Sequence, residues 1–172
     1  HYWSLANGFD ERGIEPGADA KSISNETTFG EDTSDEKIIE GALMSLCESV
    51  SARLRGDGIK CRTVTLKIRM EDFQTHTRSL TLAEPTNFID TLYKEAKALY
   101  NNFDRKGRRV RLVGVRASKM AAGNDRTLFD GIGTDGRRER VHLAIDKITK
   151  KFGSASIRHA TMSYFKGLYE EE

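Results

Sequence analysis

The stretch Cys61-Arg62-Thr63-Val64-Thr65-Leu66-Lys67-Ile68-Arg69-Met70 alternates apolar and polar residues without interruption from Thr63 onward. A period of two with β-branched residues predicts a half-buried strand, whose buried face carries Val64, Leu66, Ile68 and Met70. Its other face carries Thr63, Thr65, Lys67 and Arg69. Cations and hydroxyl donors together suit phosphate recognition. The alternative interpretation is a sheet face that is simply exposed to solvent, and this strand alone does not distinguish the two.

Charge is distributed unevenly along the 172 residues, although the net charge is only +2. Residues 1–60 contain 6 Lys/Arg and 12 Asp/Glu, residues 61–119 contain 13 and 6, and residues 120–172 contain 9 and 8. The middle segment, which contains the predicted strand, therefore has a net charge of +7. A segregated positive charge favours a polyanionic partner.

The composition favours one domain with a modest core and loose polar segments, because only 37% of the residues are hydrophobic and 31% are charged. No apolar run reaches the roughly 20 residues that cross a bilayer, and no signal peptide is visible, so we expect no membrane partner. Cys47 and Cys61 have no metal-binding spacing and are interpreted as reduced, buried thiols. These features predict a cytoplasmic location.

The hydrophobic periodicity predicts the element order β-α-β-β-α-β. Strands are expected over residues 21–29, 61–70, 74–82 and 110–117, with the third ended by Pro85. The first helix is expected to begin with a capping box of Thr33 and Glu36, and the second to be capped by Thr86. This order predicts an α+β fold, a four-stranded open sheet with two helices on one face.

The two ends of the chain are expected to be appendages. Residues 1–8 are typical of a helix end, followed by a linker to residue 20. Residues 118–136 are small and polar and are expected to lack fixed structure, whereas residues 137–152 regain a helical pattern.

Several of these stretches, in order, resemble the C-terminal part of Y-family translesion DNA polymerases of the bacterial DNA polymerase IV kind. Leu5–Asp10 resembles the end of the thumb, and Lys21–Phe29 the first strand of the little finger, with Ser24 where the family often has Gly. Four further matches follow in order: Arg62–Arg69, Thr77-Arg78-Ser79, Thr81–Thr86 and Val110–Arg116.

The resemblance implies three parts: the end of the thumb with a linker at residues 1–20, a DNA-binding little finger at 21–119, and a flexible tail with a short helix at 120–172. It implies double-stranded primer-template DNA as the partner in translesion synthesis and repair. The family's metal-binding carboxylates, and with them magnesium, belong to the palm upstream of this segment. We therefore expect no cofactor and no catalytic site in this chain, which would be active only as part of a parent polymerase at the bacterial nucleoid.

The residues expected to hold the DNA backbone are Ser22, Thr28, Thr65, Lys67, Arg69, Thr77, Arg78, Ser79, Arg111 and Arg116. Strict alternation would place Arg78 on the side of Leu80, so it needs a bulge or a position at the sheet rim. A bulge at Gly114 would bring Arg111 and Arg116 to one face while Leu112 and Val115 point to the core.

In the tail, Asp125–Phe129 keeps the final Leu-Phe of the family's clamp-binding peptide. Leu128 and Phe129 are therefore the candidate contacts with the replicative sliding clamp.

Two other classes of protein fit parts of the pattern. An RNA-binding module of the RRM type has a similar element order but needs aromatic residues on its central strands. A protein-docking module would explain the helices and Leu128-Phe129 but not the charge segregation. A complete enzyme is least supported, because no nucleophile-base pair or phosphate loop is visible and His76, His142 and His159 have no metal-ligand spacing.

Overall fold

The computed structural model describes residues 1–10, 12–13, 20–122, 135–153 and 156–165. Its elements are α1 (Tyr2–Ala6), β1 (Ser22–Thr33), α2 (Glu36–Gly56), β2 (Ile59–Met70), β3 (Thr75–Thr86), α3 (Ile89–Asn101), β4 (Val110–Ala122), α4 (Asp135–Phe152) and the short 3-10 helix η1 (Ala160–Tyr164). The order from β1 to β4 is the predicted β-α-β-β-α-β.

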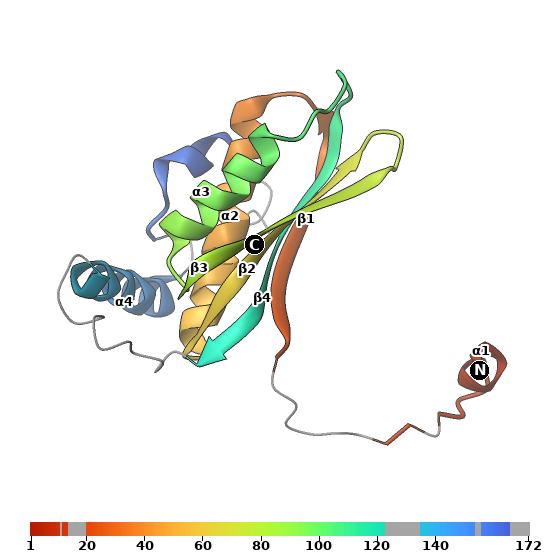
Figure 1. Ribbon diagram of the computed structural model, residues 1–172, viewed down its shortest axis with the longest axis horizontal. Helices are drawn as coiled ribbons and strands as arrows, with labels where there is room; N and C mark the ends of the chain where they lie inside the picture. Colours follow the sequence, from red (N-terminus) through yellow and green to blue (C-terminus); the bar gives the residue numbers. More distant parts are fainter. Residues whose placement is uncertain (11, 14–19, 123–134, 154–155, 166–172) are drawn as a thin grey trace.

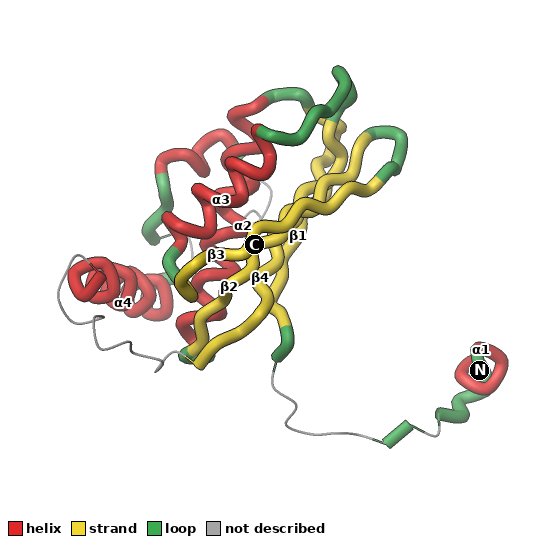
Figure 2. Tube along the Cα trace, in the orientation of Figure 1, coloured by secondary structure: helices red, strands yellow, loops and turns green. Residues whose placement is uncertain are grey.

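The four strands form one antiparallel sheet in the order β1-β4-β2-β3. Helices α2 and α3 lie on one side of this sheet, and no described helix covers its other side (Figures 1 and 2). The predicted α+β fold with two helices on one face is therefore confirmed.

The core lies between the helices and the sheet, where the periodicity placed it. The α2 residues Ile39, Leu43, Leu46, Val50 and Leu54 are fully buried. They join one cluster with the alternate β2 residues Val64, Leu66, Ile68 and Met70. Period-3.6 and period-2 patterns thus meet in a single apolar layer, which leaves the other face of the sheet free for polar side chains.

Both predicted helix caps are wrong in position. Thr33 ends β1, and the N-cap of α2 is Asp35, whose carboxylate accepts from the Lys37 backbone N–H at 2.8 Å. The N-cap of α3 is Phe88, and the Thr86 hydroxyl instead accepts from the Phe88 backbone N–H at 3.1 Å. In each case the hydroxyl binds the chain just outside the helix, so the sequence signal identifies the turn but not the cap.

All four strands are longer than predicted, and the differences at the ends of β3 and β4 matter most. β3 continues through Pro85 to Thr86, because it is an edge strand and a missing N–H is tolerated there. β4 continues to Ala122, where it pairs with Ile59. Residues 118–122 are therefore strand, contrary to the prediction of an unstructured segment that began at 118 and of a tail that began at 120. Residues 123–134, including Leu128 and Phe129, lie outside the described part of the chain.

Candidate nucleic-acid interface

The strand register defines which residues share the uncovered face of the sheet, because directly paired residues in antiparallel strands point to the same side. Starting from Thr65, Lys67 and Arg69, the pairs extend across all four strands. We call this set the polar face; it comprises Ser22, Ser24, Glu26, Thr28, Thr63, Thr65, Lys67, Arg69, Thr75, Thr77, Ser79, Thr81, Leu112, Gly114, Arg116 and Ser118.

Eight of the ten predicted DNA-binding residues lie directly on strand positions of this face, and Arg78 and Arg111 do not. Thr65 is paired with Ser79 and Arg116, and Lys67 is paired with Thr77. Ser22 and Thr28 lie on β1 in the same register. Together these residues form a surface on which hydroxyl groups surround the three cations Lys67, Arg69 and Arg116.

Hydroxyl groups on the polar face bind one another and the cations. The Thr65 and Ser79 hydroxyls lie 2.8 Å apart, and the Arg69 Nε donates to the Thr75 hydroxyl at 2.9 Å. Arg116 is exposed and has no hydrogen-bond or ion-pair partner among the residues that the structure describes. Because a hydroxyl can donate one hydrogen bond and accept others, this network holds its side chains in place and still offers donors to an anion.

Arg78 lies on the opposite face of the sheet. β2 and β3 pair without interruption from Thr63 to Arg69, and Arg78 is paired with the buried Leu66. The predicted alternative of a bulge is therefore wrong, and Arg78 sits on the edge strand, with its guanidinium 5.5 Å from the Phe103 ring. It therefore does not share the polar face with Lys67.

The bulge in β4 is at Arg111 rather than at Gly114. The pairing moves from Leu112 opposite Arg69 to Val110 opposite Met70, so Arg111 is the extra residue. Its guanidinium lies 3.3 Å from an Asp32 oxygen and 4.5 Å from the Phe73 ring. Arg111 is therefore already engaged. Val115 points to the core as predicted, but Leu112 does not: its register places it on the polar face.

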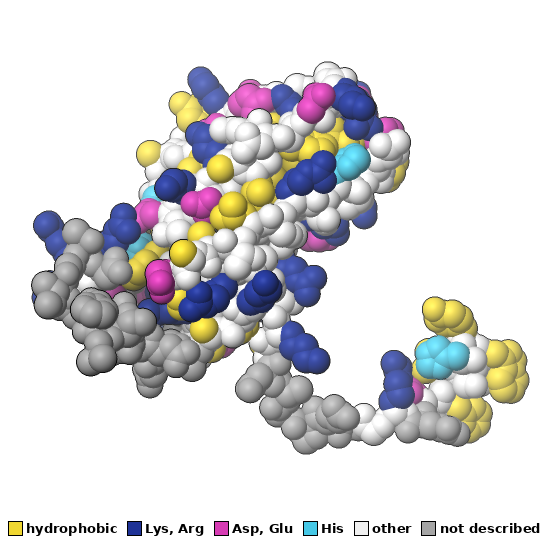
Figure 3. All heavy atoms as spheres, viewed as in Figure 1, with side chains coloured by type: hydrophobic (Ala, Val, Ile, Leu, Met, Phe, Trp, Pro, Cys, Tyr) yellow, Lys and Arg dark blue, Asp and Glu magenta, His cyan; other side chains and the backbone are white. Residues whose placement is uncertain are grey.

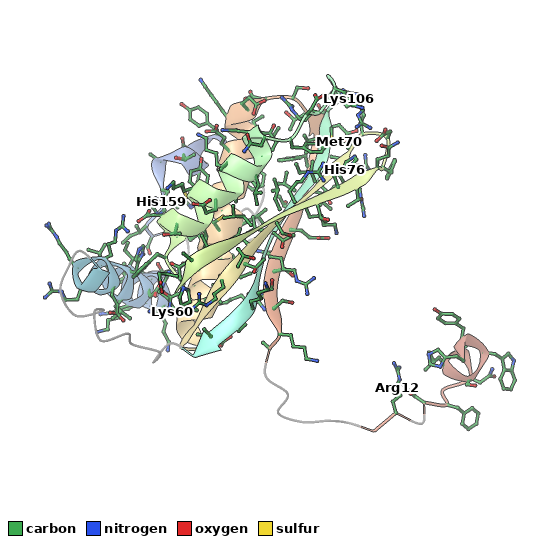
Figure 4. The ribbon with its side chains drawn as sticks, in the orientation of Figure 1. Arg12, Lys60, Met70, His76, Lys106 and His159 are labelled. Carbon is green, nitrogen blue, oxygen red and sulfur yellow. The ribbon has the colours of Figure 1, made fainter. Side chains whose placement is uncertain are left out.

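Basic residues in the α3–β4 connection are also paired with acids. Arg105 binds Glu36, Arg108 lies 2.6 Å from Asp72, and Arg109 lies 2.8 Å from Glu71. The hydrogen bond from Arg109 lowers the pKa of Glu71, which keeps this carboxylate charged. Lys106 marks this end of the sheet and Lys60 lies toward the other end (Figure 4).

Charge alone does not delimit the site. On the face of the molecule that Figure 3 shows, Lys and Arg side chains are spread over the body with Asp and Glu side chains between them. It is the register that isolates Lys67, Arg69 and Arg116 among hydroxyls. The predicted set of DNA-binding residues left out six polar residues of this face, although the alternation of polar residues in β1 was visible in the sequence. The six are Ser24, Glu26, Thr63, Thr75, Thr81 and Ser118.

The described residues contain no group of His, Cys, Asp or Glu side chains that could hold a metal ion. None of the helices in the described part of the chain has the length and apolar composition that crossing a bilayer requires.

The family model described as the impB/mucB/samB family C-terminal domain matches residues 20–128, a range that contains the whole sheet. The chain belongs to this family. The impB/mucB/samB assignment confirms the predicted resemblance and places the chain in the C-terminal domain rather than in the catalytic palm.

Curated relatives of this impB/mucB/samB chain carry the name DNA polymerase IV. The protein from Methanoculleus marisnigri is 44% identical over 119 residues, which cover 69% of this chain and 33% of the relative. The protein from Dehalococcoides mccartyi strain CBDB1 is 34% identical over 167 residues, covering 96% and 42%. The protein from Caulobacter vibrioides is 36% identical over 154 residues, covering 89% and 38%. The chain thus spans well under half of each of these relatives.

Among solved structures, the chain is similar to one described as a complex of the beta-clamp processivity factor and the little finger domain of PolIV. The two are 24% identical with a TM-score of 0.48, and the match covers 64% of this chain and 99% of the other.

Proposed function

We propose that the polar face binds the phosphate backbone of duplex DNA without reading base edges, as the DNA-holding part of a Y-family DNA polymerase engaged in translesion synthesis and repair. The observation that carries the proposal is the in-register array of Lys67, Arg69 and Arg116 among hydroxyl side chains on an uncovered sheet face. Phosphate oxygens accept from both kinds of donor, and such contacts carry no sequence information. The relatives' shared name supports the polymerase context.

Base stacking of the RRM type is not supported by the register. The positions on the two central strands of the polar face carry Thr63, Thr65, Lys67 and Arg69 on β2 and Leu112, Gly114, Arg116 and Ser118 on β4. None of these is aromatic, whereas single-stranded RNA readers stack bases on aromatic rings at such positions. Of the side chains that read groove edges bidentately, the register places Arg69 and Arg116 on this face, and the Arg69 Nε already donates to the Thr75 hydroxyl. Backbone binding therefore fits the surface better.

Salt dependence of DNA binding measures how many cations contact phosphates. Five cations would give a slope of log affinity against log salt of about −4 to −5, at roughly −0.9 per neutralised phosphate. The structure removes Arg78 from the polar face and pairs Arg111 with Asp32. With three cations left, we expect a slope of about −2 to −3.

Arg116→Ala tests the proposal, with Arg78→Ala as the matched control, because both are exposed strand arginines on opposite faces of one sheet. Arg116→Ala should weaken binding similarly on unrelated duplex sequences and flatten the salt slope by about one unit. Arg78→Ala should leave the slope unchanged. Fluorescence anisotropy titrations across a salt series measure both, and equal losses in the two variants would contradict the proposed face.

The sliding clamp remains a predicted partner through Leu128 and Phe129, which the structure does not describe. The thumb end at residues 1–20, the little finger from residue 21 and the tail that follows β4 remain a proposed division of the parent polymerase. Magnesium in its palm and its place at the nucleoid remain proposals as well.

A further inference from the structure

One row of the polar face runs from an acid to a base across a glycine. Glu26 on β1 and Lys67 on β2 are both paired with Gly114 on the strand between them, and Thr77 on β3 completes the row. Among the residues that the structure describes, Glu26 is the only acid that the register places on this face. An acid on a surface that otherwise carries cations and hydroxyls requires an explanation, because it repels phosphate.

Gly114 allows the acid and the base to meet. A Cβ at position 114 would lie 2.9 Å from the Glu26 Cβ and 3.5 Å from Glu26 Oε2, so the Glu26 side chain occupies the space that a larger residue would fill. The carboxylate thereby crosses β4, and its Oε2 lies 2.8 Å from Lys67 Nζ. The ion pair therefore spans two strand spacings, because β4 lies between β1 and β2.

The pair changes what Lys67 offers to DNA. The Glu26 side chain is 52% exposed and that of Lys67 is 32% exposed, so both face whatever lies on the sheet. A phosphate that approaches Lys67 meets the Glu26 carboxylate within the same row. The phosphate then either shares the Lys67 ammonium group with the Glu26 carboxylate or displaces that carboxylate into the interface. Either outcome makes the binding free energy of the contact less favourable.

We propose that Glu26 is an affinity-limiting residue of the DNA-binding face, held over Gly114 so that it neutralises Lys67 and weakens the grip on the phosphate backbone. This inference rests on the proposed function. It assigns the strong backbone contacts to Arg69 and Arg116 in the rows on either side, and it makes Lys67 a cation whose contribution depends on Glu26.

Glu26→Gln tests the inference, because glutamine keeps the size of the side chain and one acceptor oxygen and removes its charge. Binding to duplex DNA should become tighter on every sequence, and the salt slope should steepen by about 0.9. Between about 50 and 200 mM salt, that extra slope amounts to a further loss of roughly 3.5-fold in affinity. Lys67→Met should flatten the slope of the Glu26→Gln variant by the same amount and return it to the wild-type value.

Glu95→Gln is the matched control, since Glu95 lies on α3, on the other side of the sheet, and has Lys94 as a partner at 4.0 Å. It removes an equal charge and should not change the slope. Circular dichroism melts establish that every variant is folded.

Two failures can be told apart. If Glu26→Gln binds with unchanged affinity and slope while Arg116→Ala still flattens the slope, the inference is wrong and the proposed function stands. If Arg116→Ala has no effect either, the polar face is not the DNA-binding surface and both fail.

Discussion

At the scale of single residues, the position of a side chain across the sheet decides its chemistry more than its type does. Arg78, Arg111 and Arg116 are all arginines on strands of one sheet. The first contacts Phe103 on the helix side, the second is paired with Asp32 at a bulge, and only the third is exposed on the polar face without a partner in the described residues. We expect their replacement by alanine to affect DNA binding very differently.

The two thiols should be unreactive in the folded protein. Cys47 and Cys61 are both buried and unpaired, and burial raises both pKa values, that of Cys61 to about 11. Because the thiolate is the reactive form, Ellman's reagent at about pH 8 should label neither residue in the native protein and both in concentrated guanidinium chloride. Rapid labelling of the native protein would show that the core around β2 and α2 opens far more readily than its burial indicates.

At the scale of elements, the close approach of a helix to a peripheral segment depends on one glycine. Gly41 is buried in α2, and a Cβ there would lie 2.9 Å from the Phe165 Cβ and 3.0 Å from the Thr161 carbonyl oxygen. Phe165 in turn packs edge-on against Phe29 of β1. The glycine lets the segment around η1 pack on α2 and cover the end of the core, where Met162 is buried.

Gly41→Ala should therefore destabilise the protein despite the better helix propensity of alanine. The gain of up to about 1 kcal/mol from propensity is outweighed by overpacking, which costs about 1–3 kcal/mol. Gly56→Ala near the end of the same helix is the control, because nothing lies within 4 Å of the added Cβ. Urea unfolding should show a loss for the first variant and no loss for the second. Equal stability of the two would contradict the tight contact with Phe165.

At the scale of the whole molecule, α4 is attached to the body through polar and aromatic contacts rather than through its apolar residues. Arg55 of α2 binds Asp146 with two bonds of 2.7 Å, and the His142 ring stacks on Phe88 at 5.5 Å. In contrast, Val141 and Phe152 of the predicted apolar pattern are more than half exposed. The hydrophobic periodicity predicted this helix correctly, but the residues that contact the body are Asp146 and His142 rather than Val141 and Phe152.

Attachment of α4 should weaken as the pH falls. Burial lowers the pKa of His142, the charge of Arg55 lowers it further together with that of His159, and Asp90 and Asp146 oppose this. A detached His142 has its usual pKa of about 6.5 and binds more protons than the packed one, so packing is complete above that pH and is lost as the pH falls toward the lowered pKa. Hydrogen exchange in α4 should increase between about pH 7.5 and 5.5.

His142→Phe is the control for this titration, since it keeps a ring against Phe88 and cannot be protonated. Exchange in α4, corrected for the intrinsic pH dependence, should then be the same at both pH values. A pH response of the same size in the variant would assign the effect to the Arg55–Asp146 pair or to another group.

The sequence by itself determined the elements, the core and the family of this protein. Alternation in β2 and helical spacing in α2 depend on neighbours two to four residues apart, so residues 39–54 and 64–70 identify their own buried faces. The order of elements and the family motifs then specify an open sheet with helices on one side.

Only the tertiary structure decided which polar residues act together. The side of Arg78, the bulge at Arg111 and the contact between Glu26 and Lys67 across Gly114 depend on the pairing of strands that are distant in sequence. A shift of one residue in that pairing would move every side chain of a strand to the other face, and local periodicity cannot specify it across strands. The composition of the polar face, including the acid Glu26 within it, is therefore a property of the folded sheet.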